Sequence, residues 1–488
     1  MDIRPLDHLT AFGDPDAPAL VSGQEELSYG ELERDVGRIA ARLLALRLAK
    51  GDRIATWMPK TRLACQMPLA AARAGLVHVP INPVLKAPQA AHILADSGAG
   101  LLIANQGRLG GLESHVPTIA LEDWHDGEEH LPPSSHDTDE LAALLYTSGS
   151  TGKPKGVMLS HANLWLGAVA VADYLGMDAT ERTLALLPLA FDYGQNQLLS
   201  TWKAGGCVIA FDYLLANDVK KAVRRHDVTL LAGVPPLWHQ LVRLDWSDGE
   251  GASLRTLTNS GGHVPEPLFR QLRQLFPNAA IHLMYGLTEA FRSSSLDPEL
   301  ADTHPDSVGT AIPFAELLVV REDGSEAAPG EEGELVHAGP LVAKGYWRDE
   351  QKTAERFRPA PSHSRHGGIA AWSGDRMVRG QDGLLRFRGR DNAMIKVSGN
   401  RLSPDEIEEA ALASGQAVEA AAMGIPDEEL GEAVILHCVG SGDEQALRRW
   451  FKVNTPAYMM PKTIVWHDRL PTGATGKVDR ARLREMAR

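Results

Sequence analysis

A loop rich in glycine and hydroxyl groups is the segment of this chain best suited to chemistry. It reads TSGSTGKPKG over residues 147–156 and follows the apolar run 141–145. Glycines let backbone N–H groups approach a polyanion closely, because they carry no Cβ. Hydroxyl groups donate hydrogen bonds to phosphate oxygens, and lysine supplies positive charge. The predicted phosphate-binding residues are Thr147, Ser148, Gly149, Ser150, Thr151, Gly152 and Lys153.

This loop is not a Walker A sequence, in which Ser or Thr follows Gly-Lys. Here Pro154 follows Lys153. A plain solvated turn is the alternative interpretation, because Gly/Ser/Thr loops are common on protein surfaces. The strand-like entry and the two lysines, Lys153 and Lys155, favour phosphate binding.

TSGSTGKPKG resembles the phosphate-loop signature of the adenylate-forming (ANL) superfamily, which includes acyl-CoA synthetases, adenylation domains of nonribosomal peptide synthetases, and luciferases. Segments that resemble its motifs follow in its order at 146–156, 260–262, 285–289, 372–375, 389–401 and 471–477. The resemblance covers essentially the whole chain. It implies an AMP-forming ligase that uses ATP and Mg²⁺ to activate a carboxylic acid as an adenylate. The acyl group then passes to a pantetheine thiol, on CoA or on a carrier protein.

The superfamily assigns roles to the motif MYGLTE at 284–289. The resemblance implies that Tyr285 lies against adenine, Thr288 contacts the α-phosphate and Glu289 helps to hold Mg²⁺. An aromatic face suits a purine, and a hard carboxylate suits Mg²⁺ beside phosphates. Further residues that match nucleotide-contacting positions are Gly261, Gly262, Gly286, Asp375 and Arg390, the last two at the ribose.

The segment PTGATGK at 471–477 resembles the motif that carries the superfamily's catalytic lysine. The resemblance implies that Lys477 bridges the substrate carboxylate and the α-phosphate, stabilising charge as it redistributes. A rotation of the small lobe then withdraws Lys477 and brings residues 397–400 to the site. Relatives often carry Asp or Lys two residues after the boundary arginine. Asn392 holds that position here and Asp391 precedes it, so either residue is a candidate hinge.

The acid substrate is predicted to lie beside LPLAFDYG at 187–194. Amino-acid-activating relatives carry Phe-Asp there, and the Asp pairs with the α-ammonium of the substrate. The alternative is that Asp192 accepts a hydrogen bond from nearby backbone or from Tyr193. The predicted pocket residues are Phe191, Asp192, Tyr193, Val234, Pro235 and Ser260.

The amino-acid sequence of this region resembles that of acyl-CoA ligases (AMP-forming) called exosortase A-associated. It is also similar to stand-alone ligases that load amino acids such as proline onto carrier proteins. An amino acid is slightly favoured as substrate, and an acyl-CoA synthetase for a fatty or other acid is the alternative. A non-catalytic nucleotide-binding regulator is a further alternative. The presence of Lys477, Glu289 and Asp375 argues against it.

The elements that position these residues indicate an α/β fold. Residues 28–48 and 62–74 have helical spacing, and the second helix joins strand-like segments at 54–58 and 76–80 as a βαβ crossover. Short alternating strands dominate beyond residue 300. We expect a large N-terminal domain of mixed sheets covered by helices, with a β-rich subdomain, over 1–389. A small, mobile α+β domain that carries the catalytic lysine is expected over 390–488.

Composition bounds the remaining possibilities. A chain of 488 residues is too long for one ordinary core. Its net charge of −14 argues against nucleic acid or an anionic membrane as the main partner. The three cysteines show no metal-ligand spacing, and no signal peptide or membrane span is visible. We therefore expect a cytoplasmic enzyme whose partners are a small acid and either CoA or a carrier protein.

Overall fold

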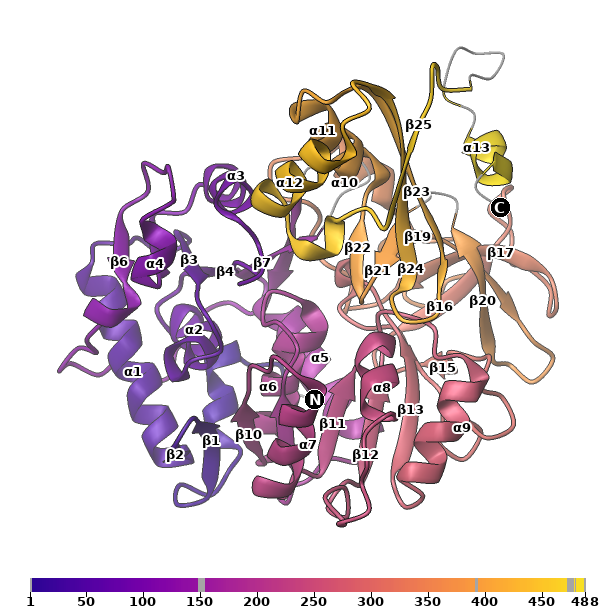
Figure 1. The fold of residues 1–488 in the computed structure, drawn as a ribbon. Coiled ribbons are helices and arrows are strands. Elements are labelled where there is room, and N and C mark those ends of the chain that lie inside the picture. The colour runs from indigo at the N-terminus through magenta and orange to yellow at the C-terminus, as the bar shows by residue number, and fades with distance from the viewer. Residues whose placement is uncertain (1, 148–153, 391–393, 472–477, 479, 487–488) are drawn as a thin grey trace.

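The computed structural model of the chain describes residues 2–147, 154–390, 394–471, 478 and 480–486 (Figure 1). Four sheets organise them: a six-stranded and a nine-stranded sheet, and two five-stranded sheets. The large sheets belong to the N-terminal part of the chain.

The six-stranded sheet is parallel except at one edge. Its order is β6 (Thr118–Ala120), β5 (Leu101–Ala104), β3 (Arg53–Trp57), β4 (Val77–Pro80), β7 (Leu141–Thr147) and β8 (Lys155–Ser160). Helix α2 (Arg62–Arg73) connects β3 to β4, and the Thr61 side chain accepts a hydrogen bond from the Ala64 N–H at its start. The predicted βαβ unit is therefore present. The antiparallel pair β7–β8 carries the predicted phosphate loop between its strands.

The nine-stranded sheet has a parallel centre with antiparallel edges. Its order is β15 (Thr310–Ala311), β14 (Ser294–Ser295), β13 (Ala280–Tyr285), β12 (Thr256–Asn259), β11 (Leu230–Gly233), β9 (Arg182–Ala185), β10 (Cys207–Ala210), β1 (Pro18–Ser22) and β2 (Glu25–Ser28). Strands β11, β12 and β13 are mutually parallel, so their carboxyl ends meet at one edge. The predicted site segments beginning at Val234, Ser260 and Gly286 follow directly at that edge.

Helices form the layers around these sheets (Figure 1). Apolar residues of both large sheets share one core with the helices α1 (Tyr29–Ala45), α2, α5 (His161–Tyr174) and α6 (Asp192–Ala204). A second core covers the other face of the nine-stranded sheet with α7 (Ala216–Arg225), α8 (Pro235–Leu241) and α9 (Glu266–Leu275). Helix α3 (Ala87–Ser97) packs on the outer face of the six-stranded sheet. The short helices are η1 (Leu6–Ala11), α4 (Gln106–Leu109), η2 (Leu121–Asp123) and η3 (Thr288–Ala290).

The β-rich subdomain is one of the five-stranded sheets. It contains β16 (Glu316–Val320), β17 (Glu332–Ala338), β18 (Phe357–Pro359), β19 (Ile369–Arg379) and β20 (Leu385–Arg390), with α10 (Glu350–Arg356) between β17 and β18. The alternating strands that the sequence indicates beyond residue 300 are thus present.

The C-terminal domain lies over the site edge of the nine-stranded sheet, drawn in orange and yellow in Figure 1. Its sheet contains β21 (Ile395–Val397), β22 (Asn400–Leu402), β23 (Ala417–Asp427), β24 (Gly431–Gly440) and β25 (Thr463–Trp466). Its helices are α11 (Pro404–Ala413), α12 (Glu444–Asn454), η4 (Ala457–Met459) and α13 (Arg480–Met486). The predicted fold class, a large N-terminal α/β domain with a small C-terminal domain, is confirmed. Among the described residues, no helix is both long and apolar enough to cross a membrane.

Candidate active site

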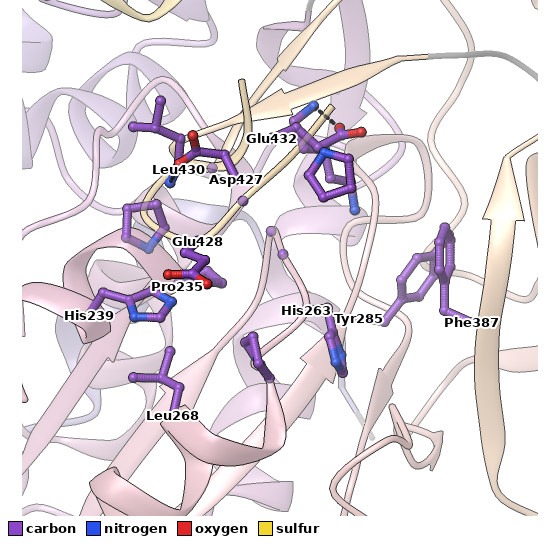
Figure 2. Close-up of a pocket in the computed structure, with 18 of the residues that line it drawn as sticks. Pro235, His239, His263, Leu268, Tyr285, Phe387, Asp427, Glu428, Leu430 and Glu432 are labelled. Atoms are coloured by element: carbon purple, nitrogen blue, oxygen red, sulfur yellow. Dashed lines mark hydrogen bonds between the residues drawn. The ribbon is translucent and has the colours of Figure 1, made fainter. Parts of the chain in front are cut away.

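Two cavities lie where the carboxyl ends of β11–β13 meet the C-terminal domain. The larger, of about 1740 Å³, is lined by Gly261, Gly262 and Tyr285. Figure 2 shows residues of the C-terminal domain, among them Asp427 and Glu428, on the opposite side of this cavity. The smaller cavity, of about 460 Å³, is lined by Phe191, Asp192, Tyr193, Val234, Ser260, Thr288, Arg292, Ser398 and Gly399, among others. Pro235, expected in the acid pocket, lines the larger cavity instead.

Tyr285 lines the larger cavity and contacts Asp375. The Tyr285 hydroxyl donates a short hydrogen bond to the Asp375 carboxylate, which is 2% exposed. Asp375 lies on β19 directly opposite Arg390 on β20 in the strand register. The structure therefore brings together three predicted nucleotide-binding residues, although more than a hundred positions separate the first, Tyr285, from the last, Arg390.

His337 is a neighbour of Tyr285 that the motifs did not reveal. Its ring stacks on that of Tyr285, with centroids 6.0 Å apart and an angle of 25° between the planes. Burial lowers the pKa of His337 to about 3, so the imidazole is neutral at physiological pH. Neither ring nitrogen has a hydrogen-bond partner among the described residues.

Glu289 is a buried carboxylate with one oxygen unused. Its Oε1 accepts a hydrogen bond of 2.7 Å from the Tyr346 hydroxyl, and its Oε2 has no partner in the described part of the chain. Burial raises the pKa of Glu289, but the positive charges of Arg356 and Arg401 outweigh that effect. The pKa therefore lies below the ordinary value for a glutamate. An ionised carboxylate with a free oxygen fits Mg²⁺, which takes one or two carboxylates and otherwise binds water and substrate phosphates.

Arg356, at the end of α10, is a second residue that sequence reasoning missed. Burial lowers its pKa, but Glu289, Tyr346 and Asp375 raise it more, so the guanidinium stays charged. Its Nε has no partner among the described residues. An arginine at the end of a polar helix looks like surface charge, and no local signal distinguishes it. Its place between Glu289 and Asp375 appears only in the folded chain.

The phosphate loop is described at its two ends. Thr147 closes β7 and pairs with Lys155 at the start of β8. Burial and the neighbouring Lys352 lower the pKa of Lys155 to about 8, and its Nζ lies 5.2 Å from the Tyr346 ring centre. The remaining predicted loop residues Ser148, Gly149, Ser150, Thr151, Gly152 and Lys153 lie outside the described residues, as do Asp391, Asn392 and Lys477.

The acid pocket begins at the first turn of α6. Phe191 is the N-cap residue of this helix, and Asp192 is its first residue. The Thr288 hydroxyl donates a 3.2 Å hydrogen bond to Asp192 Oδ1. Tyr193 turns away from Asp192 and donates a 2.7 Å hydrogen bond to the Thr258 carbonyl. Among the described residues, the side-chain partner of Asp192 is thus the Thr288 hydroxyl rather than backbone or Tyr193, and this bond links the acid pocket to the segment 285–289.

The C-terminal domain reaches this pocket through residues 397–400. Ser398 and Gly399 line the smaller cavity, with φ angles of +50° and +79°. A Cβ on Gly399 would lie 3.0 Å from Cγ1 of Val234. Arg401 donates a 3.4 Å hydrogen bond to the Gly286 carbonyl. The segment 397–400 is the one that rotation of the C-terminal domain is expected to bring to the site for transfer of the acyl group to a thiol.

Comparison with known proteins decides the family. The family model for AMP-binding enzymes matches residues 9–347, and the model for their C-terminal domain matches residues 406–477. This chain belongs to the AMP-binding enzyme family. The predicted adenylate-forming superfamily is thereby confirmed, together with an AMP-forming acid–thiol ligase activity that uses ATP and Mg²⁺ and a CoA or carrier-protein acceptor.

Its relatives differ in the acids they are named for. The AMP-binding enzyme is 34% identical to a feruloyl-CoA synthase of an Amycolatopsis species, over 96% of each chain. It is 31% identical to an L-proline–[L-prolyl-carrier protein] ligase of Pseudomonas fluorescens, over 96% of this chain and 95% of that one. A solved o-succinylbenzoate CoA synthetase of Bacillus subtilis matches with a TM-score of 0.88 and 26% identity, covering 99% and 98% of the two chains.

Proposed function

We propose that this ligase activates an amino acid and that Asp192 binds the substrate ammonium group. The supporting observation is a carboxylate in the acid cavity whose partner is the neutral Thr288 hydroxyl. Asp192 forms no ion pair with a described residue. A carboxylate beside a substrate pocket is stabilised by a cation, and an α-ammonium next to the reacting carboxylate supplies one.

The reaction that we propose has two steps on one site. A carboxylate oxygen of the substrate attacks the α-phosphorus of ATP, pyrophosphate leaves, and an acyl-adenylate forms. Lys477 and Thr288 stabilise the charge at the α-phosphate, and Glu289 holds Mg²⁺, which neutralises phosphate charge when bound. A pantetheine thiol then attacks the acyl carbon and AMP leaves.

The nucleotide is proposed to lie in the larger cavity. Tyr285, Gly261 and Gly262 line that cavity and surround the adenine in this proposal. Asp375 and Arg390 bind the ribose, since they lie opposite one another on β19 and β20. The loop 147–153 holds the phosphates.

The proposed domain boundary falls between residues 389 and 390, with Asp391 or Asn392 as the hinge. Strand β20 of the subdomain ends at Arg390, one residue beyond this boundary, and β21 of the C-terminal sheet begins at Ile395, which supports a boundary in this region. We also propose a cytoplasmic location. All three cysteines are unpaired and buried, which suits a reducing compartment.

ATP–pyrophosphate exchange with amino acids and their des-amino analogues tests the proposal. We expect the wild type to prefer the amino acid. Asp192→Asn, which keeps the shape and removes the charge, should lower exchange with that amino acid roughly 10- to 100-fold, the value of a charged hydrogen bond. Exchange with the des-amino acid should change little, since it brings no cation.

The feruloyl-CoA synthase relative favours a second candidate, an acyl-CoA synthetase for an acid without an amino group. Efficient activation of plain acids, with every amino acid ignored, would establish this candidate in place of the first. If Asp192→Asn lowered exchange equally with the amino acid and with the des-amino acid, Asp192 would instead act through Thr288.

A further inference from the structure

Arg292 is a buried cation on the wall of the acid cavity. Arg292 is 4% exposed and lines the smaller cavity together with Asp192 and Tyr193. The guanidinium carbon lies 4.4 Å from the centre of the Tyr193 ring. Arg292 forms no hydrogen bond or ion pair with any described residue, and its Nε is buried without a partner. A buried charge in this condition is costly unless another group neutralises it.

The carboxylates around the cavity have other partners, among them Glu406, whose Oε2 accepts a 3.4 Å hydrogen bond from the Ser403 N–H. Glu289 faces Arg356 and Arg401. Asp212 forms an ion pair of 2.7 Å with Lys60, and Asp192 accepts the Thr288 hydroxyl. The Arg292 guanidinium contacts the neutral Tyr193 ring, which offers only a weak cation–π interaction. The described protein therefore provides no anion for Arg292.

The backbone at Arg292 is held in an unfavourable conformation. Phe291 and Arg292 have φ angles of +43° and +122°, where residues with a Cβ are strained. The Phe291 side chain is fully buried, and a Cβ on Gly167 would approach its ring to 2.2 Å. The packing of Phe291 against Gly167 thus fixes the strained segment. Strain of this kind clusters at ligand-binding sites.

Two buried polar residues that are close in sequence to Arg292 or Tyr193 have side-chain atoms without a partner in the described part of the chain. Ser293 follows Arg292 and is 0% exposed, and its hydroxyl lacks a hydrogen bond among the described residues. Gln195, two residues after Tyr193 in α6, is also 0% exposed, and both of its amide atoms lack a partner there. The residue next to Arg292 in the chain, Ser293, therefore also has hydrogen-bonding capacity that no described group uses.

We infer that Arg292 binds a second, non-reacting carboxylate of the acid substrate. A guanidinium matches a carboxylate in planar, bidentate geometry, and its charge persists when buried. The substrate class is then a dicarboxylic acid, or an amino acid with an acidic side chain where Asp192 binds an ammonium group. This inference rests on the proposed activation of an acid in this cavity and does not depend on the ammonium at Asp192.

ATP–pyrophosphate exchange of the wild type with matched acids tests the inference without any variant. The panel pairs butyrate with succinate, and 2-aminobutyrate with aspartate and glutamate. We expect a higher kcat/KM for the members with two carboxylates. Activation of the single-carboxylate members alone would overturn the inference while leaving acid activation intact. Activation of none of a broad panel of acids would overturn the proposed function as well.

Substitution of Arg292 provides the second measurement. Arg292→Met, which keeps most of the length and removes the charge, should lower kcat/KM for the preferred diacid about 100- to 1000-fold. The matched single-carboxylate acid should be activated as before, and Arg292→Lys should recover part of the loss. If kcat/KM fell equally for both members of a pair, Arg292 would instead bind the reacting carboxylate or be needed for folding. Either result would overturn the inference. A higher kcat/KM for succinate than for aspartate would contradict the proposed binding of an ammonium group by Asp192. It would still support the binding of a second carboxylate by Arg292.

Discussion

At the scale of single residues, the site depends on buried charges and on the groups beside them. Asp375 is almost fully buried, and its carboxylate accepts the Tyr285 hydroxyl. Glu289 and Arg356 stabilise each other's charged forms, and Tyr346 donates to the same glutamate. Glu289 and Arg356 are thus held ionised by their neighbours, which prepares the site for a charged nucleotide.

Replacement of Asp375 by Ala is expected to weaken ATP binding. The ribose would lose hydrogen bonds to a charged acceptor, each worth about 1.5–3 kcal/mol, so even one lost bond raises the dissociation constant roughly 10- to 100-fold. Nucleotide titration by calorimetry measures the change. Tyr285→Phe is the control, because it removes the hydroxyl that binds Asp375 and keeps both the carboxylate and the aromatic face. An Asp375→Ala protein with wild-type ATP affinity contradicts the proposed role.

At the scale of elements, the start of α6 shapes the acid pocket. The segment 187–191 folds back on the first turn of this helix, so that the Pro188 carbonyl lies directly over Gly194. A Cβ at Gly194 would stand 2.0 Å from that oxygen, a distance that no side chain can hold. Glycine here permits the close approach that places Phe191 and Asp192 on the cavity wall.

Gly194→Ala is expected to displace the segment 187–191 from the helix. The clash involves backbone, so overpacking should cost about 1–3 kcal/mol of the free energy of unfolding. Denaturant-induced unfolding measures this loss, and ATP–pyrophosphate exchange should fall with it, since Asp192 moves. Gly107→Ala in α4 is the matched control. A Cβ there meets nothing within 4 Å, so the change should be neutral or stabilise by up to ~1 kcal/mol. Equal stability of both variants would contradict the expected clash.

At the scale of the whole molecule, the C-terminal domain completes the site. Gly399 touches Val234, Arg401 reaches the Gly286 carbonyl, and Gln89 of α3 donates a 3.1 Å hydrogen bond to the Asn454 carbonyl. These contacts hold the segment 397–400 beside the acid cavity. The arrangement suits the thiol-transfer step, because the segment expected at the site in that step is present there.

Gly399→Ala and Lys477→Ala are expected to impair opposite half-reactions. The Gly399 variant should lose thioester formation and keep pyrophosphate exchange, because its Cβ would crowd Val234 only in this domain arrangement. The Lys477 variant should lose exchange and still transfer the acyl group from presynthesised adenylate. Both half-reactions are measured separately for each protein.

Gly442→Ala is the control for Gly399. Gly442 has a φ of +77°, close to the +79° of Gly399, but its Cβ would meet nothing within 4 Å. It therefore bears the same backbone strain away from the interface. Loss of both half-reactions in either test variant, or thioester loss in Gly442→Ala, would contradict the assignment.

The sequence by itself determined the family and the fold class, and it predicts most of the residues that we propose for the site. This is because local rules act on short segments: glycine and hydroxyl groups in the loop 147–156, and the helix that begins at Pro404 after Ser403. Apolar periodicity likewise placed α1 and α2 close to their observed bounds. Such signals need no knowledge of distant partners.

Only the tertiary structure decided which charges face one another. Thr288 and Asp192 are 96 positions apart in sequence, and their hydrogen bond exists because α6 and the end of β13 meet at one sheet edge. Arg356 and Arg292 look like ordinary surface arginines in the sequence, yet one lies between two buried carboxylates and the other lines the acid cavity without an anion. Burial and partners set the energy of a charge, and both are properties of the folded chain.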